Sequence, residues 1–169
     1  MKPFIRYAGG HLDRAGLFRK DEDWISAKLA HPKTQIVPVW RSKNLVDDLP
    51  SAPKSRVVDR ADASEILELA HQTTLLGISG DVAYFAADIS SLEEEPAHAL
   101  VNQGDFVDLR QVGPLLGADE SSLLAHARGM LFWHKRHQHC GVCGAPTKSH
   151  EGGHMRKCTS TECGAPSFP

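Results

Sequence analysis

The chain has 169 residues, enough for one domain with a substantial hydrophobic core and a small second unit. Its 19 lysines and arginines are outnumbered by 21 aspartates and glutamates, which gives a formal net charge of −2. A mildly acidic chain lacks the overall positive field that is typical of nucleic-acid-binding proteins. No uninterrupted apolar stretch approaches the roughly 18 residues of a membrane-spanning helix. The composition excludes such a span in this sequence, and we expect a soluble, cytoplasmic protein.

Residues 1–118 alternate short apolar runs with modest helical segments, a pattern that predicts an α+β fold with an antiparallel sheet and a few helices. Residues 35–40 are predicted to form a strand. Pro38 lacks the N–H that a central strand donates, so it indicates an edge or bulged position. The β-rich runs 73–78 and 82–89 flank a Ser-Gly-Asp turn, which is typical of a β-hairpin.

Two short helices are predicted in the same part of the chain. Asp21 is a favoured N-cap residue for the first helix, whose inner face repeats at helical spacing. That face comprises Trp24, Ile25, Lys28 and Leu29. Residues 63–69 are predicted to form the second helix. Residues 92–96 contain three glutamates and a proline, and we expect an exposed acidic loop there because charge runs favour solvated segments.

The strongest helix signal begins at Asp119, a favoured N-cap residue, and continues over residues 120–137. Its apolar face follows amphipathic spacing and comprises Leu123, Leu124, Ala127, Met130, Leu131 and His134. We expect this face to pack on the N-terminal sheet. We also expect Phe132 and Trp133 to contribute to that burial rather than to a binding function, because aromatic side chains commonly serve cores.

All four cysteines lie close to the C-terminal end of the sequence. Cys140 and Cys143 are separated by two residues, Cys158 follows after fourteen more, and Cys163 after another four. This is the spacing of a zinc ribbon, in which two cysteine turns hold one tetrahedral Zn²⁺ through four thiolates at about 2.3 Å. The sequence predicts one zinc ion per chain. Four protein ligands leave no position for water or substrate, so this zinc would be structural.

The residues around the cysteines support the same interpretation. Gly144 and Gly164 follow the two cysteine pairs, where a sharp turn requires positive φ and where we expect amides to point at sulfur. Residues 151–154, with the sequence Glu-Gly-Gly-His, are predicted to form a hairpin turn, and residues 155–157 the returning strand.

Other uses of the cysteines are less well supported. A redox-active pair at Cys140 and Cys143 would need a βαβ context. Disulfides would need an oxidising compartment, and residues 1–7 lack the apolar core of a signal peptide. Nearby histidines could replace a cysteine ligand, but four thiolates already fill a structural site, so we expect the histidines at the surface or around the metal ligands. They are His134, His137, His139, His150 and His154.

Residues 128–157 are locally positive, with Glu151 as their one acidic residue. The six basic residues are Arg128, Lys135, Arg136, Lys148, Arg156 and Lys157. A zinc ion with four thiolates carries a net negative charge, and compensation of that charge is favoured over phosphate binding as the explanation.

Several segments closely resemble the zinc-ribbon region of the NADH pyrophosphatase (NAD diphosphatase) branch of the Nudix hydrolases. They are residues 127–134, 140–147, 151–158 and 167–169. A weaker resemblance to the N-terminal domain of that family covers Leu12-Asp13-Arg14, Leu17, Arg19, Asp21 and residues 38–41. The resemblance extends over essentially the whole sequence.

The resemblance implies three parts, namely an N-terminal Nudix-associated domain (1–118), a connecting helix (119–139) and a zinc ribbon (140–169). It implies that the full enzyme, a homodimer, cleaves the pyrophosphate of NAD(H) to NMN(H) and AMP, and also acts on NAD-capped RNA. The Mg²⁺- or Mn²⁺-binding Nudix box of the family is absent from this sequence, and the glutamates at 93–95 lack its spacing. No catalytic residue of the family can therefore be assigned here, and we expect a structural, dimerising, non-catalytic portion of a truncated enzyme.

Two alternatives remain open from the sequence. The chain could be a freestanding zinc-ribbon module that binds nucleic acid or a protein partner through residues 128–157. A freestanding enzyme is the weaker alternative, because the sequence offers no recognisable set of nucleophile, base and orienting group.

Overall fold

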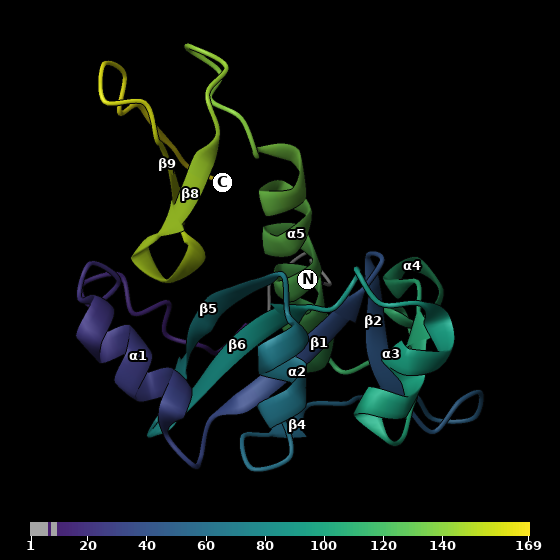
Figure 1. Cartoon of the computed structure of the whole chain (residues 1–169). Helices are drawn as coiled ribbons and strands as arrows, with labels where there is room; N and C mark the ends of the chain where they lie inside the picture. Colours follow the sequence, from purple (N-terminus) through teal and green to yellow (C-terminus); the bar gives the residue numbers. More distant parts are fainter. Residues whose placement is uncertain (1–6, 8–9) are drawn as a thin grey trace, which may run out of the picture.

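The computed structural model describes residue 7 and residues 10–169, so most of the N-terminal stretch 1–7 considered above lies outside the described residues. The described chain forms a sheet with flanking helices, from which a small C-terminal ribbon projects beside a long helix (Figure 1). This is the α+β class expected from the sequence. Within the described residues, no helix is both long enough and apolar enough to cross a membrane.

Seven strands of the described chain form the larger sheet, in the order β3-β2-β1-β6-β5, with β4 also pairing with β1 and β7 with β2. The strands are β1 Gln35–Trp40, β2 Lys43–Asp47, β3 Lys54–Ser55, β4 Val58–Asp59, β5 Gln72–Ser79, β6 Val82–Asp88 and β7 Asp105–Val107. The pairing of β1 with β6 is parallel, and the other pairings are antiparallel. A three-stranded antiparallel sheet follows, formed by β8 Thr147–His150, β9 Met155–Cys158 and β10 Pro166–Ser167.

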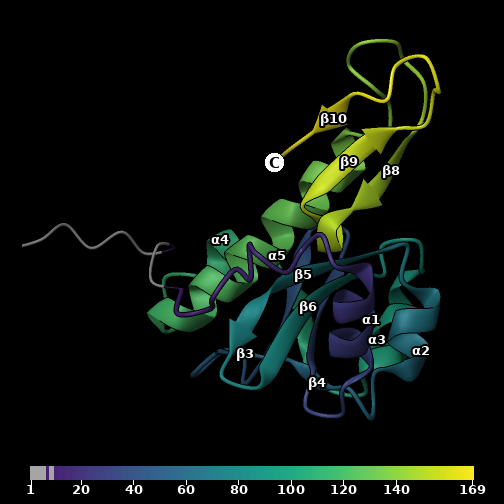
Figure 2. The same ribbon diagram turned by 90° about the vertical axis from the view of Figure 1, so that its left-hand side faces the viewer.

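Helices cover both faces of the larger sheet. They are α1 Glu22–Ala30, α2 Ser64–Leu69, α3 Glu94–Val101, α4 Leu109–Val112 and α5 Ala118–Arg136. Figure 2 shows α5 on one side of the sheet and α1, α2 and α3 on the other. Successive residues of β1 serve opposite faces: Ile36 and Trp40 pack in one apolar cluster with Ile25 of α1, while Val37 and Val39 pack in the other with α5. A strand buried on both faces explains the nearly continuous apolar run at residues 35–40.

The edge position predicted for β1 is wrong, because this strand lies inside the sheet between β2 and β6. Pro38 pairs with Ala87 of β6 on one side. On the other side, β4 pairs with Gln35 and Ile36 while β2 pairs with Val39 and Trp40, so Pro38 lies at the gap between two partner strands. A missing N–H costs no ladder hydrogen bond at such a gap, which is why a central strand tolerates proline here.

The predicted hairpin and short helices are confirmed. Strands β5 and β6 pair around a turn in which Gly80 has φ +56°, with a bulge between Leu75 and Gly77. The Asp21 carboxylate accepts a hydrogen bond from the Trp24 amide at 2.9 Å and caps α1. Residues 92–96 are not a loop throughout: α3 begins at Glu94, so two exposed glutamates lie in its first turn, where the helix dipole favours negative charge.

The long helix is confirmed, but its N-cap is Gly117 and not Asp119. The Glu120 carboxylate accepts from the Gly117 amide at 3.1 Å and from the Ser55 amide at 2.8 Å, so a side chain inside the first turn performs the capping. Five of the six residues predicted for the inner face of α5 are buried, and Leu123 is half-buried. Phe132 departs from the prediction because its side chain is 49% exposed, and Trp133 is half-buried against the ring of His137.

Candidate metal centre

The cysteines lie on two turns that β8 and β9 bring together. In the first turn, the Cys140 amide donates to Ala145 O at 2.8 Å, and in the second the Cys158 amide donates to Ala165 O at 3.0 Å. The antiparallel register places Thr147, which follows the first turn, opposite Cys158. Gly144 and Gly164 complete the two turns with φ values of +76° and +57°, as their positions after the cysteine pairs predicted.

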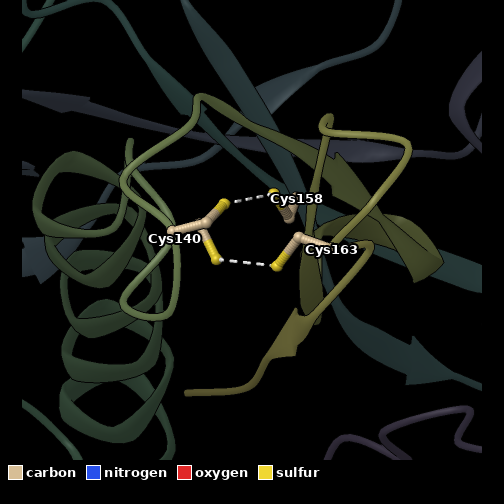
Figure 3. Close-up of side chains that lie close together, drawn as sticks. Cys140, Cys158 and Cys163 are labelled. Carbon is tan, nitrogen blue, oxygen red and sulfur yellow. Dashed lines mark hydrogen bonds between the residues drawn. The ribbon is translucent and has the colours of Figure 1, made fainter.

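The four sulfur atoms converge on one point. All four Sγ atoms lie within 4.8 Å of one another, with 3.8 Å between Cys140 and Cys163 and 3.4 Å between Cys143 and Cys158. Figure 3 shows the side chains of Cys140, Cys158 and Cys163 turned toward one another. Tetrahedral Zn–S bonds of about 2.3 Å would place neighbouring sulfurs at about 3.8 Å, so the donor set fits a zinc ion in both chemistry and size. The four cysteines are free thiols and form no disulfide.

Backbone amides also point at two of the sulfurs. The Val142 amide donates to Cys140 Sγ and the Ser160 amide donates to Cys158 Sγ, both at 3.4 Å. The amides of the two glycines were expected to point at sulfur, but they bond to backbone carbonyls instead. The Gly144 amide donates to Cys140 O, and the Gly164 amide donates to Ser160 O. The glycines thus set the turns, and the amides two residues after a cysteine orient the sulfurs.

The thiols differ in pKa. Hydrogen bonds from the amides of Cys143 and Val142 lower the pKa of Cys140 to about 7. The Ala165 amide lowers the pKa of Cys163, but the neighbouring sulfur of Cys143 and burial outweigh it and raise that pKa to about 12. Four thiolates in this volume would repel one another, and a divalent cation at their centre removes that repulsion.

Two of the five histidines expected at the surface or around the metal ligands are instead buried between the ribbon and the rest of the chain. The His134 side chain on α5 is 1% exposed, and its Nε2–H donates to Gly153 O at 2.8 Å. His154 is 8% exposed, and its Nε2–H donates to Leu75 O of β5 at 2.6 Å. Burial lowers the pKa of each to about 4, so both are neutral at pH 7. His137 and His150 are half-buried, and His139 is exposed.

Arg156 is the residue that sequence reasoning missed. It was counted among the basic residues around the zinc site, but its side chain is 5% exposed and serves four hydrogen bonds. Its Nε donates to Thr147 Oγ1 at 2.8 Å, and its Nη2 donates to Thr147 O at 2.8 Å and to Gln138 Oε1 at 3.3 Å. Its Nη1 donates to His134 Nδ1 at 3.0 Å. The sequence signal was only the alternation of β9, in which Arg156 shares an inner face with Cys158.

Comparison with known proteins identifies the protein family. Residues 33–133 match the model of the NADH pyrophosphatase-like rudimentary NUDIX domain, and residues 135–168 match the NADH pyrophosphatase zinc ribbon domain. The chain therefore belongs to the NADH pyrophosphatase family. The four cysteines at the metal centre fall inside the zinc ribbon match.

Individual relatives carry related names. The human NAD-capped RNA hydrolase NUDT12 is 28% identical over 90% of this chain and 39% of its own length. The NAD-capped RNA hydrolase NudC of Deinococcus radiodurans is 31% identical over 78% of this chain and 49% of its own length. The human mitochondrial NAD(P)H pyrophosphatase NUDT13 is 36% identical over 46% of this chain and 24% of its own length. The chain thus aligns with less than half of each relative.

Proposed function

We propose that Cys140, Cys143, Cys158 and Cys163 bind one structural Zn²⁺ per chain. The single observation that carries this proposal is the convergence of four free thiols within 4.8 Å of one another. The zinc would supply folding energy to a segment of three short strands, and it would have no open coordination position for chemistry.

We further propose that the chain is the scaffold portion of a Nudix hydrolase that cleaves the pyrophosphate of NAD(H) to NMN(H) and AMP. Membership of the family and the names of the relatives, which include NAD-capped RNA hydrolases, support this substrate class. In this proposal residues 1–118 form the N-terminal Nudix-associated domain, 119–139 the connecting helix and 140–169 the zinc ribbon. The scaffold contributes to a cytoplasmic homodimer and carries no catalytic group of its own, the Mg²⁺ or Mn²⁺ sites belonging to a catalytic domain.

The glutamates at 93–95 are exposed at the surface. Glu93 forms an ion pair with Arg41 at 3.1 Å, and both side chains are solvent-exposed. Metal-assisted attack on a pyrophosphate needs several carboxylates on one surface to hold divalent ions. Among the described residues, the four cysteines are the grouping of His, Cys, Asp and Glu that can hold a metal ion.

The alternative of a freestanding nucleic-acid-binding module receives less support from the side chains. Arg156 is buried and donates all its hydrogen bonds inside the protein. Arg128 is half-buried, and its Nε donates to Ser42 O at 2.8 Å. Two of the six basic residues that suggested phosphate binding are therefore committed to internal contacts.

Native mass spectrometry of the purified chain, with and without a chelator, tests the zinc proposal. We expect one zinc ion per chain that the chelator removes. A metal-free chain, or one whose mass shows two disulfides, would refute it.

Incubation of the same chain with NADH and either Mg²⁺ or Mn²⁺ tests the scaffold proposal. We expect no AMP above the level of a buffer control, because the residues that the structure describes offer no carboxylate cluster for the metal. Formation of many AMP molecules per chain by the chain alone would show that it carries a catalytic site.

A further inference from the structure

Two arginines lie close together on the segment that runs along α5 before helix α1 begins (Figure 2). Arg19 Nε donates to Arg14 O at 2.7 Å, which holds the two residues together. Among the described residues, neither guanidinium forms an ion pair with a carboxylate. Burial and the charge of Arg14 lower the pKa of Arg19, and Glu151 and Asp13 offset only part of this effect. The pair therefore carries positive charge that the protein does not neutralise.

The Arg14 guanidinium faces the ring of His126 on α5. Its Nη1 donates to His126 Nδ1 at 2.6 Å and also contacts Nε2. Burial, together with the charge of Arg14, lowers the pKa of His126 to about 3, so the ring is neutral at pH 7. A neutral imidazole has one acceptor nitrogen and no charge, whereas a guanidinium has five N–H donors. Arg14 is thus positioned by His126 without being neutralised, and it keeps unused donors.

Arg14 and His126 both line a cavity of about 200 Å³ between the N-terminal segment, β6 and the first half of α5. The rest of its wall is largely apolar, formed by Leu12, Val57, Leu123 and the ring of Tyr84. A dry apolar cavity of about 150 Å³ can hold a benzene molecule. The volume here therefore suits one six-membered ring with a small substituent.

Two hydroxyl groups line the same cavity, those of Ser122 and Tyr84. Neither has a hydrogen-bond partner among the residues that the structure describes. Ser122 is 5% exposed, and a hydroxyl buried to this degree is normally paired. Both hydroxyls are therefore available to a polar group on a ligand.

The carboxylates that line the cavity are already engaged. Glu120 accepts from the Ser55 amide at 2.8 Å and also from the amide that begins α5. Asp119 Oδ1 lies 3.5 Å from His11 Nδ1. Among the charged groups of the cavity wall, Arg14 is thus the one left without a partner of opposite charge.

We propose that this cavity binds a small anion that carries one ring. The ring would lie against Leu123 and Tyr84, and its carboxylate or phosphate would bind Arg14. A guanidinium matches the oxygens of either head group through two parallel hydrogen bonds. None of the four cysteines lines the cavity, so this site stands apart from the metal centre and from cleavage of NAD(H).

NMR titration of the isotope-labelled, zinc-loaded chain tests the proposal, with benzoate and phenyl phosphate as probes. We expect a Kd on the order of 1 mM or tighter for at least one of them, with shifts concentrated at Arg14, Tyr84, Ser122 and His126. The tighter of the two probes identifies the head group. Benzamide has the ring without the charge and inorganic phosphate has the charge without the ring, so each should bind at least about tenfold more weakly.

Two pairs of variants separate the charge from the cavity. Arg14→Met should weaken binding by about tenfold or more, whereas Arg110→Met should not, because Arg110 is exposed, pairs with Asp108 and lies outside the cavity. Val57→Phe should abolish binding by filling the cavity, and Val107→Phe makes the same change on a strand residue that does not line it. Melting curves verify that each variant is folded.

Three results would overturn the proposal. The first is the absence of shifts at these residues with about 10 mM of either aromatic anion. The second is equal affinity for benzamide, which would leave Arg14 without a role. The third is unchanged affinity in Arg14→Met, a variant that decides the matter even if Val57→Phe fails to fold.

Discussion

The buried guanidinium of Arg156 offers a sharp test of how the ribbon is held to α5. Substitution of Arg156 by Met keeps most of the side-chain volume but removes all four hydrogen bonds. Thr147 O and His134 Nδ1 would remain buried without their donor, at a cost of about 1–3 kcal/mol for each group. The desolvation that lowers the pKa of Arg156 is relieved at the same time, which offsets part of this cost.

We therefore expect Arg156→Met to lower the free energy of unfolding by about 3 kcal/mol, which corresponds to about 6–12 °C in melting temperature for a chain of this size. The assay is thermal and denaturant unfolding of the zinc-loaded protein, followed by circular dichroism. Lys148→Met is the matched control, because Lys148 is exposed on the neighbouring strand and faces Lys157 across the pair. It should change stability by no more than about 0.5 kcal/mol. Equal stabilities of the two variants would refute this account of Arg156.

Three further changes have defined outcomes. Cys158→Ser should lose its zinc and unfold the ribbon while the hairpin around Gly80 stays folded; stoichiometric zinc with wild-type melting would contradict the metal site. Glu120→Ala should cost about 1–2 kcal/mol through loss of the α5 cap, against about 0.5 kcal/mol or less for Asp119→Ala, and equal losses would restore the sequence-based cap. Burial lowers the pKa of three histidines below the ordinary value of 6.5, to about 3 for His126 and about 4 for His134 and His154. The unfolded chain therefore binds more protons in this range, and the melting temperature should fall as pH drops from 6.5 toward 4, with zinc content checked at each pH; a flat profile would contradict the burial of these rings in neutral form.

Much of the fold was predicted from local sequence patterns. The Asp21 cap, the β5–β6 hairpin and the glycines after each cysteine pair depend on residues a few positions apart, and the structure has all three. The cysteine spacing likewise predicts convergence of the sulfurs, because two short turns joined by a hairpin have few other arrangements. Interactions of this range can be read from sequence because the chain itself keeps the partners close.

The tertiary structure decided what each side chain meets at long range. Pro38 lies in a central strand because two partner strands happen to leave a gap beside it, and no local signal reports that gap. His154 is buried because β5, 79 positions away in the sequence, supplies Leu75 O as its acceptor. Phe132 is half-exposed because it directly follows Leu131, which belongs to the face of α5 that packs on the sheet. One residue rotates the side-chain direction by about 100° around the helix, so Phe132 points away from that face. The sequence by itself determined strands β1, β5, β6 and β9, helices α1, α2 and α5, and the convergence of the four cysteines. Burial and the contacts of the ribbon with β5 depended on the packing of distant segments.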